Sequence, residues 1–250
     1  SGEVDPELRC LVIDSSLGVN VEMKLSVDID YRFHLDEEFL AGVRDAGFRF
    51  VSISHLHGDA LTGDDWRRDV DQTGNLLARL GLSCVQTHLP SYPILSSSEE
   101  YDDALQERVK RALEAAHILG ARWGAYHPRT SMKYNYDTQR AYQDNREQIG
   151  EFLETCEMFN VGLAIENLPI FPDCPQYKFY TANTEDLIRL TDSFGSNRIG
   201  VCWDTGHANL IASSQVSSIR ALGKRIKIVH IHSNNRMYDD HLPPSLGTVD

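Results

Sequence analysis

The amino-acid sequence predicts an α/β fold of the (β/α)8 TIM-barrel type, with the eighth βα unit missing or truncated. Short apolar runs alternate with longer amphipathic segments along most of the chain, which is typical of parallel strands covered by helices. The polar residues that end these runs stand at positions 55, 88, 127, 166, 204 and 232, with gaps of 33, 39, 39, 38 and 28 residues. Each gap has room for one strand, one helix and their loops. The length of 250 residues is also close to that of one such barrel.

Seven strands are expected in chain order, at residues 24–30, 49–54, 84–87, 123–126, 162–165, 199–203 and 226–231. The first of them, Lys24–Asp30, alternates apolar and polar residues with the period of a strand. The others are short apolar runs, and most are followed by a longer amphipathic segment. Strands that alternate with helices in this way predict a parallel sheet.

Six helices are expected between the strands, at about residues 36–44, 66–80, 98–119, 138–159, 184–194 and 214–222. In the first of them the apolar residues fall on one helical face. The second and third end at Gly81 and Gly120, positions where a glycine commonly closes a helix. Thr184 and Asp186 supply capping groups at the start of the fifth.

A doubly wound open sheet is the first alternative fold. It would normally carry a glycine-rich phosphate-binding turn after the first strand, and Asp28–Phe33 has none. A closed barrel needs eight strands, whereas seven are found. Either the eighth βα unit has been cut off or lost, or the apolar run Leu8–Ile13 takes its place, and the sequence leaves both open. We divide the chain into an N-terminal extension at 1–23 and a single barrel domain at 24–250.

Composition and charge exclude several classes of protein. With 41% hydrophobic and 24% charged residues the chain can bury a core, which excludes wholesale disorder. Its 24 basic and 37 acidic residues give a formal net charge of −13 without basic clusters, so no nucleic-acid partner is expected. We find no run of 18 apolar residues and no signal peptide, and therefore expect no membrane contact and a cytoplasmic location. The five cysteines are widely spaced, as reduced thiols are, and the choice between monomer and homo-oligomer stays open.

Titratable residues follow five successive strands, at the end where barrel enzymes place their chemistry. They are His88, His127, Glu166, Asp204 with His207, and His232, and the loop after the last strand adds Asp239 and His241. Imidazoles and carboxylates together are the ligands of divalent zinc, manganese, cobalt or iron, and they suit magnesium less. Singly, each has a structural explanation, such as helix capping by Asp204. Buried together without partners they would be costly to desolvate, so the pattern favours a metal site.

Two histidines of the last strand, His230 and His232, face the same side because alternate residues of a strand do. Only the one nearer the strand end reaches the mouth of the barrel. This favours His232 as the ligand and gives His230 a filling or supporting role. By the same reasoning His55, after the second strand, is a wall residue of the site rather than a ligand.

At these residues the sequence resembles the xylose isomerase-like barrel superfamily, which holds sugar phosphate isomerases and epimerases and the type IV apurinic endonucleases. The resemblance spans about residues 24–250 and rests on Ala164-Ile-Glu-Asn-Leu-Pro169, Val201-Cys-Trp-Asp-Thr-Gly-His207, Val229-His-Ile-His232 and Asp239-Asp-His-Leu-Pro-Pro244. Similarity to the epimerases implies Glu166, Asp204 and His232 as metal ligands and His207 as a substrate contact. Similarity to the endonucleases implies His88, His127, His207, Asp239 and His241 as further metal ligands. Both branches also use a glutamate of strand eight, which this sequence does not show.

The resemblance implies an isomerase or epimerase of a sugar or sugar phosphate, with Glu166 and His207 as catalytic residues. A divalent metal (zinc, manganese or cobalt, magnesium less so) would stabilise the enediolate formed by proton transfer. The candidate substrate-binding residues are Arg129, Asn167, Arg236 and His55. Two alternatives stay open. A multinuclear metal-dependent phosphodiesterase is favoured by the number of ligands, although the net charge disfavours DNA. A catalytically silent sugar-binding barrel is favoured by the absent strand-eight carboxylate.

Overall fold

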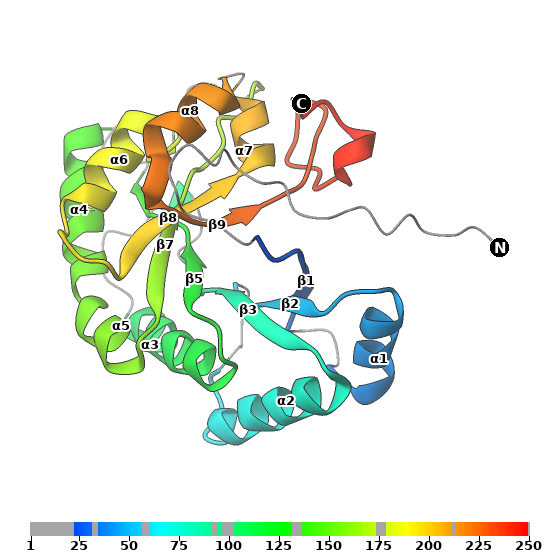
Figure 1. Ribbon diagram of the computed structural model, residues 1–250. Coiled ribbons are helices and arrows are strands. Elements are labelled where there is room, and N and C mark those ends of the chain that lie inside the picture. The colour runs from blue at the N-terminus through cyan, green and yellow to red at the C-terminus, as the bar shows by residue number, and fades with distance from the viewer. Residues whose placement is uncertain are drawn as a thin grey trace.

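The computed structural model describes residues 23–31, 35–56, 61–91, 95–96, 103–131, 137–173, 179–211 and 214–249. Seven strands form one sheet, in the order β1 (Ser26–Asp30), β2 (Phe50–Ser54), β3 (Ser83–His88), β5 (Trp123–Tyr126), β7 (Gly162–Glu166), β8 (Ile199–Asp204) and β9 (Ile226–His230). All neighbouring strands are parallel. The sheet curls into an incomplete barrel with helices on its outside (Figure 1). The predicted barrel-type α/β fold with seven strands is therefore confirmed.

The helices are α1 (Glu37–Asp45), α2 (Trp66–Leu80), α3 (Asp103–Ile118), α4 (Thr138–Gly150), α5 (Leu153–Phe159), α6 (Thr184–Asp192), α7 (Thr205–Leu210) and α8 (Gln215–Leu222). The prediction of one helix at 138–159 was wrong, because α4 ends at Gly150 and α5 begins at Leu153. Glycine is a poor helix former, which accounts for a break at that position. The short helix α7 was not predicted. None of the helices in the described ranges is both long and apolar enough to cross a membrane.

Helix ends follow the expected chemistry with one shift. Gly81 and Gly120 have φ of +71° and +82°, the left-handed conformation that glycine adopts without strain. Helix α6 is capped by Asn183 and not by the predicted Thr184 and Asp186. The side chain of Asn183 accepts a hydrogen bond of 2.7 Å from the backbone N–H of Asp186. The cap lies one residue earlier because the capping position needs extended backbone, which Asn183 has at φ −101° and ψ 152°.

The alternation of the strands separates two layers of apolar side chains. Residues such as Val51, Ile165 and Val201 belong to the large core that the sheet shares with the helices. The other faces of four strands contribute a small separate cluster of Ala125, Ala164, Cys202 and Ile228. Two residues further along the same strands come His127, Glu166, Asp204 and His230. These titratable residues therefore form the next layer of the inner face, above a floor of apolar side chains.

The two ends of the sheet are β1 and β9, and no strand lies between them in the described part of the chain. The eighth position of the barrel is therefore not filled by any described residue. The run Leu8–Ile13, our alternative occupant of that position, lies outside the described residues, as does the predicted extension apart from Met23. A separate pair of two-residue strands, β4 (Leu95–Ser96) and β6 (Thr130–Ser131), joins the loops that follow β3 and β5.

Candidate functional site

The predicted site residues gather where the parallel strands end. His88, Glu166, Asp204 and His230 are the last residues of β3, β7, β8 and β9, and His127 follows β5 directly. Because parallel strands end at one edge of a sheet, their terminal side chains meet there. Glu166 and Asp204 are each 1% exposed, so both carboxylates are removed from bulk water.

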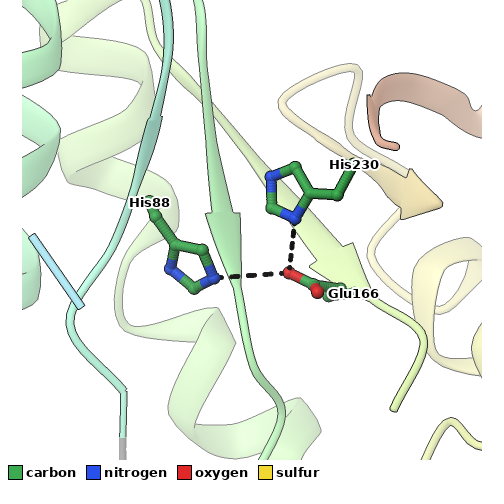
Figure 2. A group of neighbouring side chains, drawn as sticks. All are labelled: His88, Glu166 and His230. Atoms are coloured by element: carbon green, nitrogen blue, oxygen red, sulfur yellow. Dashed lines mark ion pairs between the residues drawn. The ribbon is translucent and has the colours of Figure 1, made fainter. Parts of the chain in front are cut away.

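An inner group surrounds Glu166. Its Oε2 atom lies 3.4 Å from Nε2 of His88, 3.3 Å from Nε2 of His127 and 3.4 Å from Nδ1 of His230. Figure 2 shows the rings of His88 and His230 converging on this oxygen from two strands. Nevertheless, Glu166 Oε2 is buried without a partner for a well-aligned hydrogen bond. Three imidazoles therefore face one carboxylate oxygen at ion-pair distances, without the geometry of a well-aligned hydrogen bond.

The backbone fixes the orientation of His88 in this group. Nδ1 of His88 lies 3.1 Å from the carbonyl oxygen of Leu89. A carbonyl only accepts, so Nδ1 carries the proton, and in neutral His88 the lone pair is on Nε2. That nitrogen faces Glu166 and lies 3.2 Å from Nε2 of His127. A ligand histidine is commonly held in this way by a hydrogen bond from its other nitrogen.

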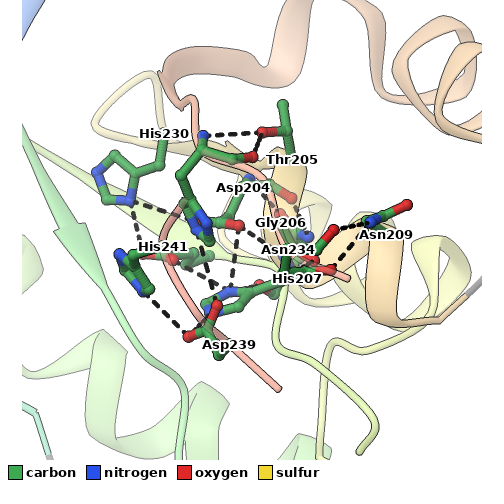
Figure 3. Close-up of polar contacts among 12 residues, drawn as sticks. Asp204, Thr205, Gly206, His207, Asn209, His230, Asn234, Asp239 and His241 are labelled. Carbon is green, nitrogen blue, oxygen red and sulfur yellow. Dashed lines mark hydrogen bonds and ion pairs between the residues drawn. The ribbon is translucent and has the colours of Figure 1, made fainter. Parts of the chain in front are cut away.

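An outer group lies beyond Asp204 (Figure 3). Nε2 of His232 is 2.9 Å from Oδ2 of Asp204. Oδ2 of Asp239 lies 3.2 Å from Nε2 of His207 and 3.1 Å from Nε2 of His241. The rings of His232 and His241 stack at 3.9 Å with 8° between their planes. The predicted set from the last strands and the following loop is therefore brought together.

His207 joins the two groups. Its Nδ1 atom lies 3.3 Å from Oε1 of Glu166 and 3.7 Å from Oδ1 of Asp204. The same nitrogen is 2.8 Å from the carbonyl oxygen of Asn167, to which it donates its proton. Nε2 of His207 is thereby directed at Asp239. Glu166, Asp204 and Asp239 are thus linked through one imidazole.

Opposite charges govern protonation in the cluster when no cation is bound. Burial alone would raise the pKa of Glu166, but His230 and His127 outweigh it and hold that pKa well below its usual range. Burial opposes protonation of His207, but Asp204, Asp239 and Glu166 outweigh it and raise its pKa to about 10. The pKa of His230 is also raised well above its usual value, against burial, with Cys202 and Glu166 as the causes. The cluster therefore holds protons among its carboxylates.

Cation binding is expected to release protons near neutral pH, because an imidazole must be deprotonated to coordinate a metal. The pKa of about 10 for His207 means that this proton is still bound at pH 7 to 8, so the apparent cation affinity should rise with pH. In the cation-free protein, pH acts on the stability of the fold, and this effect has the opposite sign because stability falls as the pH rises. Protonated His207 stabilises the fold fully below about pH 6.5, and this stability is lost as the pH rises through about 10.

Calorimetric titration with Mn²⁺ or Zn²⁺ measures this linkage. Titrations at one pH in two buffers of different ionisation enthalpy give the number of protons released. We expect about one or more per cation at pH 7.5. No proton release, together with a cation affinity that stays constant between pH 6 and 9, would show that His207 is not protonated in the cation-free protein.

The donor set fits a divalent cation. The described residues contain three groups of side chains, and within each group the ligand atoms lie within 4.8 Å of one another. The groups are His88, Glu166 and His230; Asp204, His207 and His232; and His232, Asp239 and His241. Besides Glu166 Oε2, the buried atoms Asp239 Oδ1 and His232 Nδ1 lack a hydrogen-bond partner. Buried polar atoms without partners are unfavourable, and a cation would satisfy the two carboxylate oxygens. Glu166 and His232, predicted as ligands of one metal, fall in different groups, and His230 stands with Glu166.

The four residues predicted to bind substrate have different surroundings. His55 is 4% exposed, its Nδ1 lacks a partner, and burial lowers its pKa to about 4, so the ring is neutral at physiological pH. Arg129 is buried, and its charge acts on Asp144 of α4. Arg236 is exposed and donates from Nε to Oδ1 of Asn209 at 3.1 Å. Asn167 is 2% exposed, and both polar atoms of its side chain are bonded to the main chain of Asp204.

Sequence reasoning gave His230 only a filling or supporting role, and it overlooked the importance of Gly206. The register pairs His230 with Asp204, so β9 ends at the same level as β8. The spacing of two residues from Ile228 to His230, repeated on three neighbouring strands, could have revealed that His230 lies level with the other site residues.

Gly206 lies so close to the ring of His232 that a Cβ there would overlap it. No sequence signal marks that approach.

Sequence comparisons place the chain among known proteins. A family model described as "Xylose isomerase-like TIM barrel" matches residues 40–250. The uncharacterized protein y4fM of Sinorhizobium fredii is 34% identical over 240 residues, which cover 83% of this chain and 72% of that protein. The D-psicose 3-epimerase of Enterocloster bolteae is 30% identical over 129 residues, or 51% of this chain. The match covers 40% of that enzyme, so the likeness extends over less than half of its length.

Solved structures share the fold. A D-tagatose 3-epimerase-like protein superposes with a TM-score of 0.72 at 20% identity, covering 90% of this chain and 83% of that one. The IOLI protein, solved with a bound zinc atom, gives a TM-score of 0.67 at 15% identity, covering 90% and 81%. At these identities the likeness establishes the barrel fold, and the residues of the site carry the argument about function.

Proposed function

Because this chain belongs to the xylose isomerase-like TIM barrel family, we propose that it is a divalent-cation-dependent isomerase or epimerase of a sugar or sugar phosphate. The observation that carries the proposal is Glu166, a buried carboxylate whose Oε2 faces three imidazoles and has no hydrogen-bond partner. The D-psicose 3-epimerase among the relatives and the tagatose-epimerase-like structure support this reaction class.

The residues that would hold the cation are Glu166 with His88 and His230 on one side, and Asp204 with His207 and His232 on the other. The zinc in a protein of the same fold supports a divalent ion there, with zinc, manganese or cobalt suited to this donor set. Such an ion supplies Lewis-acid polarisation of a carbonyl and the neighbouring hydroxyl of the substrate. His127, Asp239 and His241 are proposed as further ligands.

Glu166 has the properties of a proton acceptor. In the cation-free protein its carboxylate is ionised, because neighbouring imidazoles hold its pKa low, and with 1% exposure it is largely shielded from water. Removing a proton from the carbon beside a carbonyl leaves the electron pair delocalised onto the carbonyl oxygen. Protonation of the opposite face would give the epimer and needs a second acid, because Glu166 lies on the face from which it takes the proton. Return of the proton from Glu166 to the neighbouring carbon, with transfer of the hydroxyl proton to the former carbonyl oxygen, would give the isomer. His207 would act through its Nε2 atom, because its Nδ1 donates to the carbonyl oxygen of Asn167, and that nitrogen would hold the cation once it has lost its proton.

The remainder of the substrate would contact the residues that surround the mouth of the barrel. We propose His55 as a hydrogen-bonding residue, because its buried Nδ1 has no partner and its ring is neutral. Arg236 and Arg129 stay candidates for hydroxyl or phosphate groups. Asn167 is not proposed as a substrate contact, since both polar atoms of its carboxamide are already bonded to the main chain of Asp204.

The test is interconversion of ketoses in deuterated water. The protein loaded with Mn²⁺, Co²⁺ or Zn²⁺ is incubated with D-psicose, D-fructose or D-tagatose, and products are separated by chromatography. We expect a new ketose or aldose with deuterium on the carbon beside the carbonyl. Chelation should abolish the reaction, and added cation should restore it. Full activity after complete chelation would contradict the cation-dependent mechanism, and a loaded protein that neither converts nor exchanges any of these sugars or their phosphates would contradict the function.

A phosphodiesterase is the second candidate, because three groups of ligand atoms lie together in the described residues. Metal analysis of the purified protein separates the two. One equivalent per chain favours the isomerase. Two or three equivalents, with hydrolysis of bis(p-nitrophenyl) phosphate, would favour the hydrolase. Ketose binding in calorimetry without conversion would identify a silent sugar-binding barrel.

A further inference from the structure

Asn167 is the residue directly after Glu166, beyond the end of β7. Its carboxamide makes a reciprocal pair of hydrogen bonds with the main chain of Asp204. Oδ1 accepts from the backbone N–H of Asp204 at 2.7 Å, and Nδ2 donates to the carbonyl oxygen of Asp204 at 2.9 Å. Both polar atoms of the side chain therefore have backbone partners, and its 2% exposure leaves it little surface for a substrate.

This pair extends the contact between β7 and β8 past the end of their ladder. The last paired residues of the two strands are Glu166 and Cys202, two residues short of Asp204. A carboxamide carries one donor and one acceptor in nearly the arrangement of a peptide group, so it can replace a rung of the sheet. The backbone of Asp204 is thereby held to the residue that follows Glu166.

The main chain of Asn167 acts on His207 as well. Its carbonyl oxygen accepts from Nδ1 of His207 at 2.8 Å, which directs Nε2 of that ring at Asp239. His207 is held from the other side by its own backbone N–H, which donates to Oδ1 of Asp204 at 2.7 Å. One asparagine therefore connects Glu166 by a peptide bond, Asp204 by its side chain and His207 by its carbonyl.

We propose that Asn167 is a positioning residue that sets the distance between the Glu166 and Asp204 carboxylates and the orientation of His207, and that it does not contact substrate. The inference depends on the proposed function in one respect only, namely that the cluster holds a cation. Without the carboxamide, the backbone of Asp204 would lose these two hydrogen bonds, and the two carboxylates would lose their common support.

Asn145 provides a matched control. It is 0% exposed and makes the same reciprocal pair, with the backbone N–H and carbonyl of Arg129, both at 2.7 Å. It also donates to the carbonyl of Ala141. Its partner Arg129 belongs to none of the three groups of cation ligands. Asn145→Ala therefore removes the same kind of bonds while leaving the carboxylates in place.

The test compares Asn167→Ala, the nearly isosteric Asn167→Asp, and Asn145→Ala in the full chain. Removing a supporting hydrogen bond typically costs about 10- to 100-fold in cation affinity. We expect a loss of this size for Co²⁺ in calorimetry for both Asn167 variants, and a value within about threefold of wild type for Asn145→Ala. At saturating Co²⁺, the visible absorption spectrum, which reports coordination geometry, should change only in the Asn167 variants.

A readout without cation separates this inference from the proposed function. In the cation-free wild type, ¹⁵N NMR should show a slowly exchanging Nδ1–H of His207, and Asn167→Ala should lose its protection. If the wild type takes up no Co²⁺, the cation-dependent function fails, and this resonance still decides the role of Asn167. Wild-type Co²⁺ affinity and spectrum in Asn167→Ala, unchanged protection of His207, or an equal loss in Asn145→Ala would overturn the inference.

Discussion

Replacement of Glu166 by glutamine should lower the affinity for a divalent cation by about a hundredfold or more and abolish sugar interconversion. The neutral amide keeps the size of the side chain but removes the charge on which the His88, His127 and His230 nitrogens converge. Loss of one member of a buried charged group costs about 3–5 kcal/mol, and each 1.4 kcal/mol corresponds to a factor of ten. Calorimetry and metal analysis after dialysis measure the affinity, and the ketose assay measures the activity.

Glu157→Gln is the matched control for this variant. Glu157 pairs with Nε of Arg198 at 3.2 Å on the surface, where its side chain is 57% exposed. Exposed ion pairs contribute at most about 1 kcal/mol, so this variant should keep wild-type cation affinity and nearly wild-type stability. Unchanged metal content in Glu166→Gln would show that Glu166 is not a ligand, and the proposed mechanism would be abandoned.

Gly206→Ala should displace His232 and weaken the outer ligand group. A Cβ at position 206 would overlap the His232 ring, which is held by Asp204 at 2.9 Å and stacked on His241 at 3.9 Å. The ring cannot move away without giving up one of these contacts. Overpacking of this kind costs about 1–3 kcal/mol. Denaturant unfolding should show that loss, and a cation titration should show weaker binding or fewer equivalents.

Gly42→Ala is the control for the glycine substitution. Gly42 lies inside α1, and a Cβ there has nothing within 4 Å. Alanine is favoured over glycine in a helix, so this variant should be about 0.5–1 kcal/mol more stable than wild type, with unchanged cation binding. A Gly206→Ala protein with wild-type stability and cation binding would mean that His232 repositions freely and is not needed as a ligand.

The sequence predicted most of the fold because its signals are local. Alternation of apolar residues marked the first strand, a helical period marked α1, and Gly81 and Gly120 marked two helix ends, all through interactions between residues near in the chain. The break between α4 and α5 and the cap at Asn183 were missed. Both depend on backbone angles that several neighbouring residue types allow.

For the site, the sequence by itself determined which residues reach the mouth, because parallel strands end at one edge of a sheet and put Glu166 and Asp204 there. Only the tertiary structure decided which atoms face one another. It put His230 level with Asp204, used the carboxamide of Asn167 inside the scaffold, and brought Gly206 against His232. These contacts depend on the register and curvature of seven strands packed together. No stretch of sequence encodes that geometry alone, because it arises from residues as far apart as Glu166 and His230.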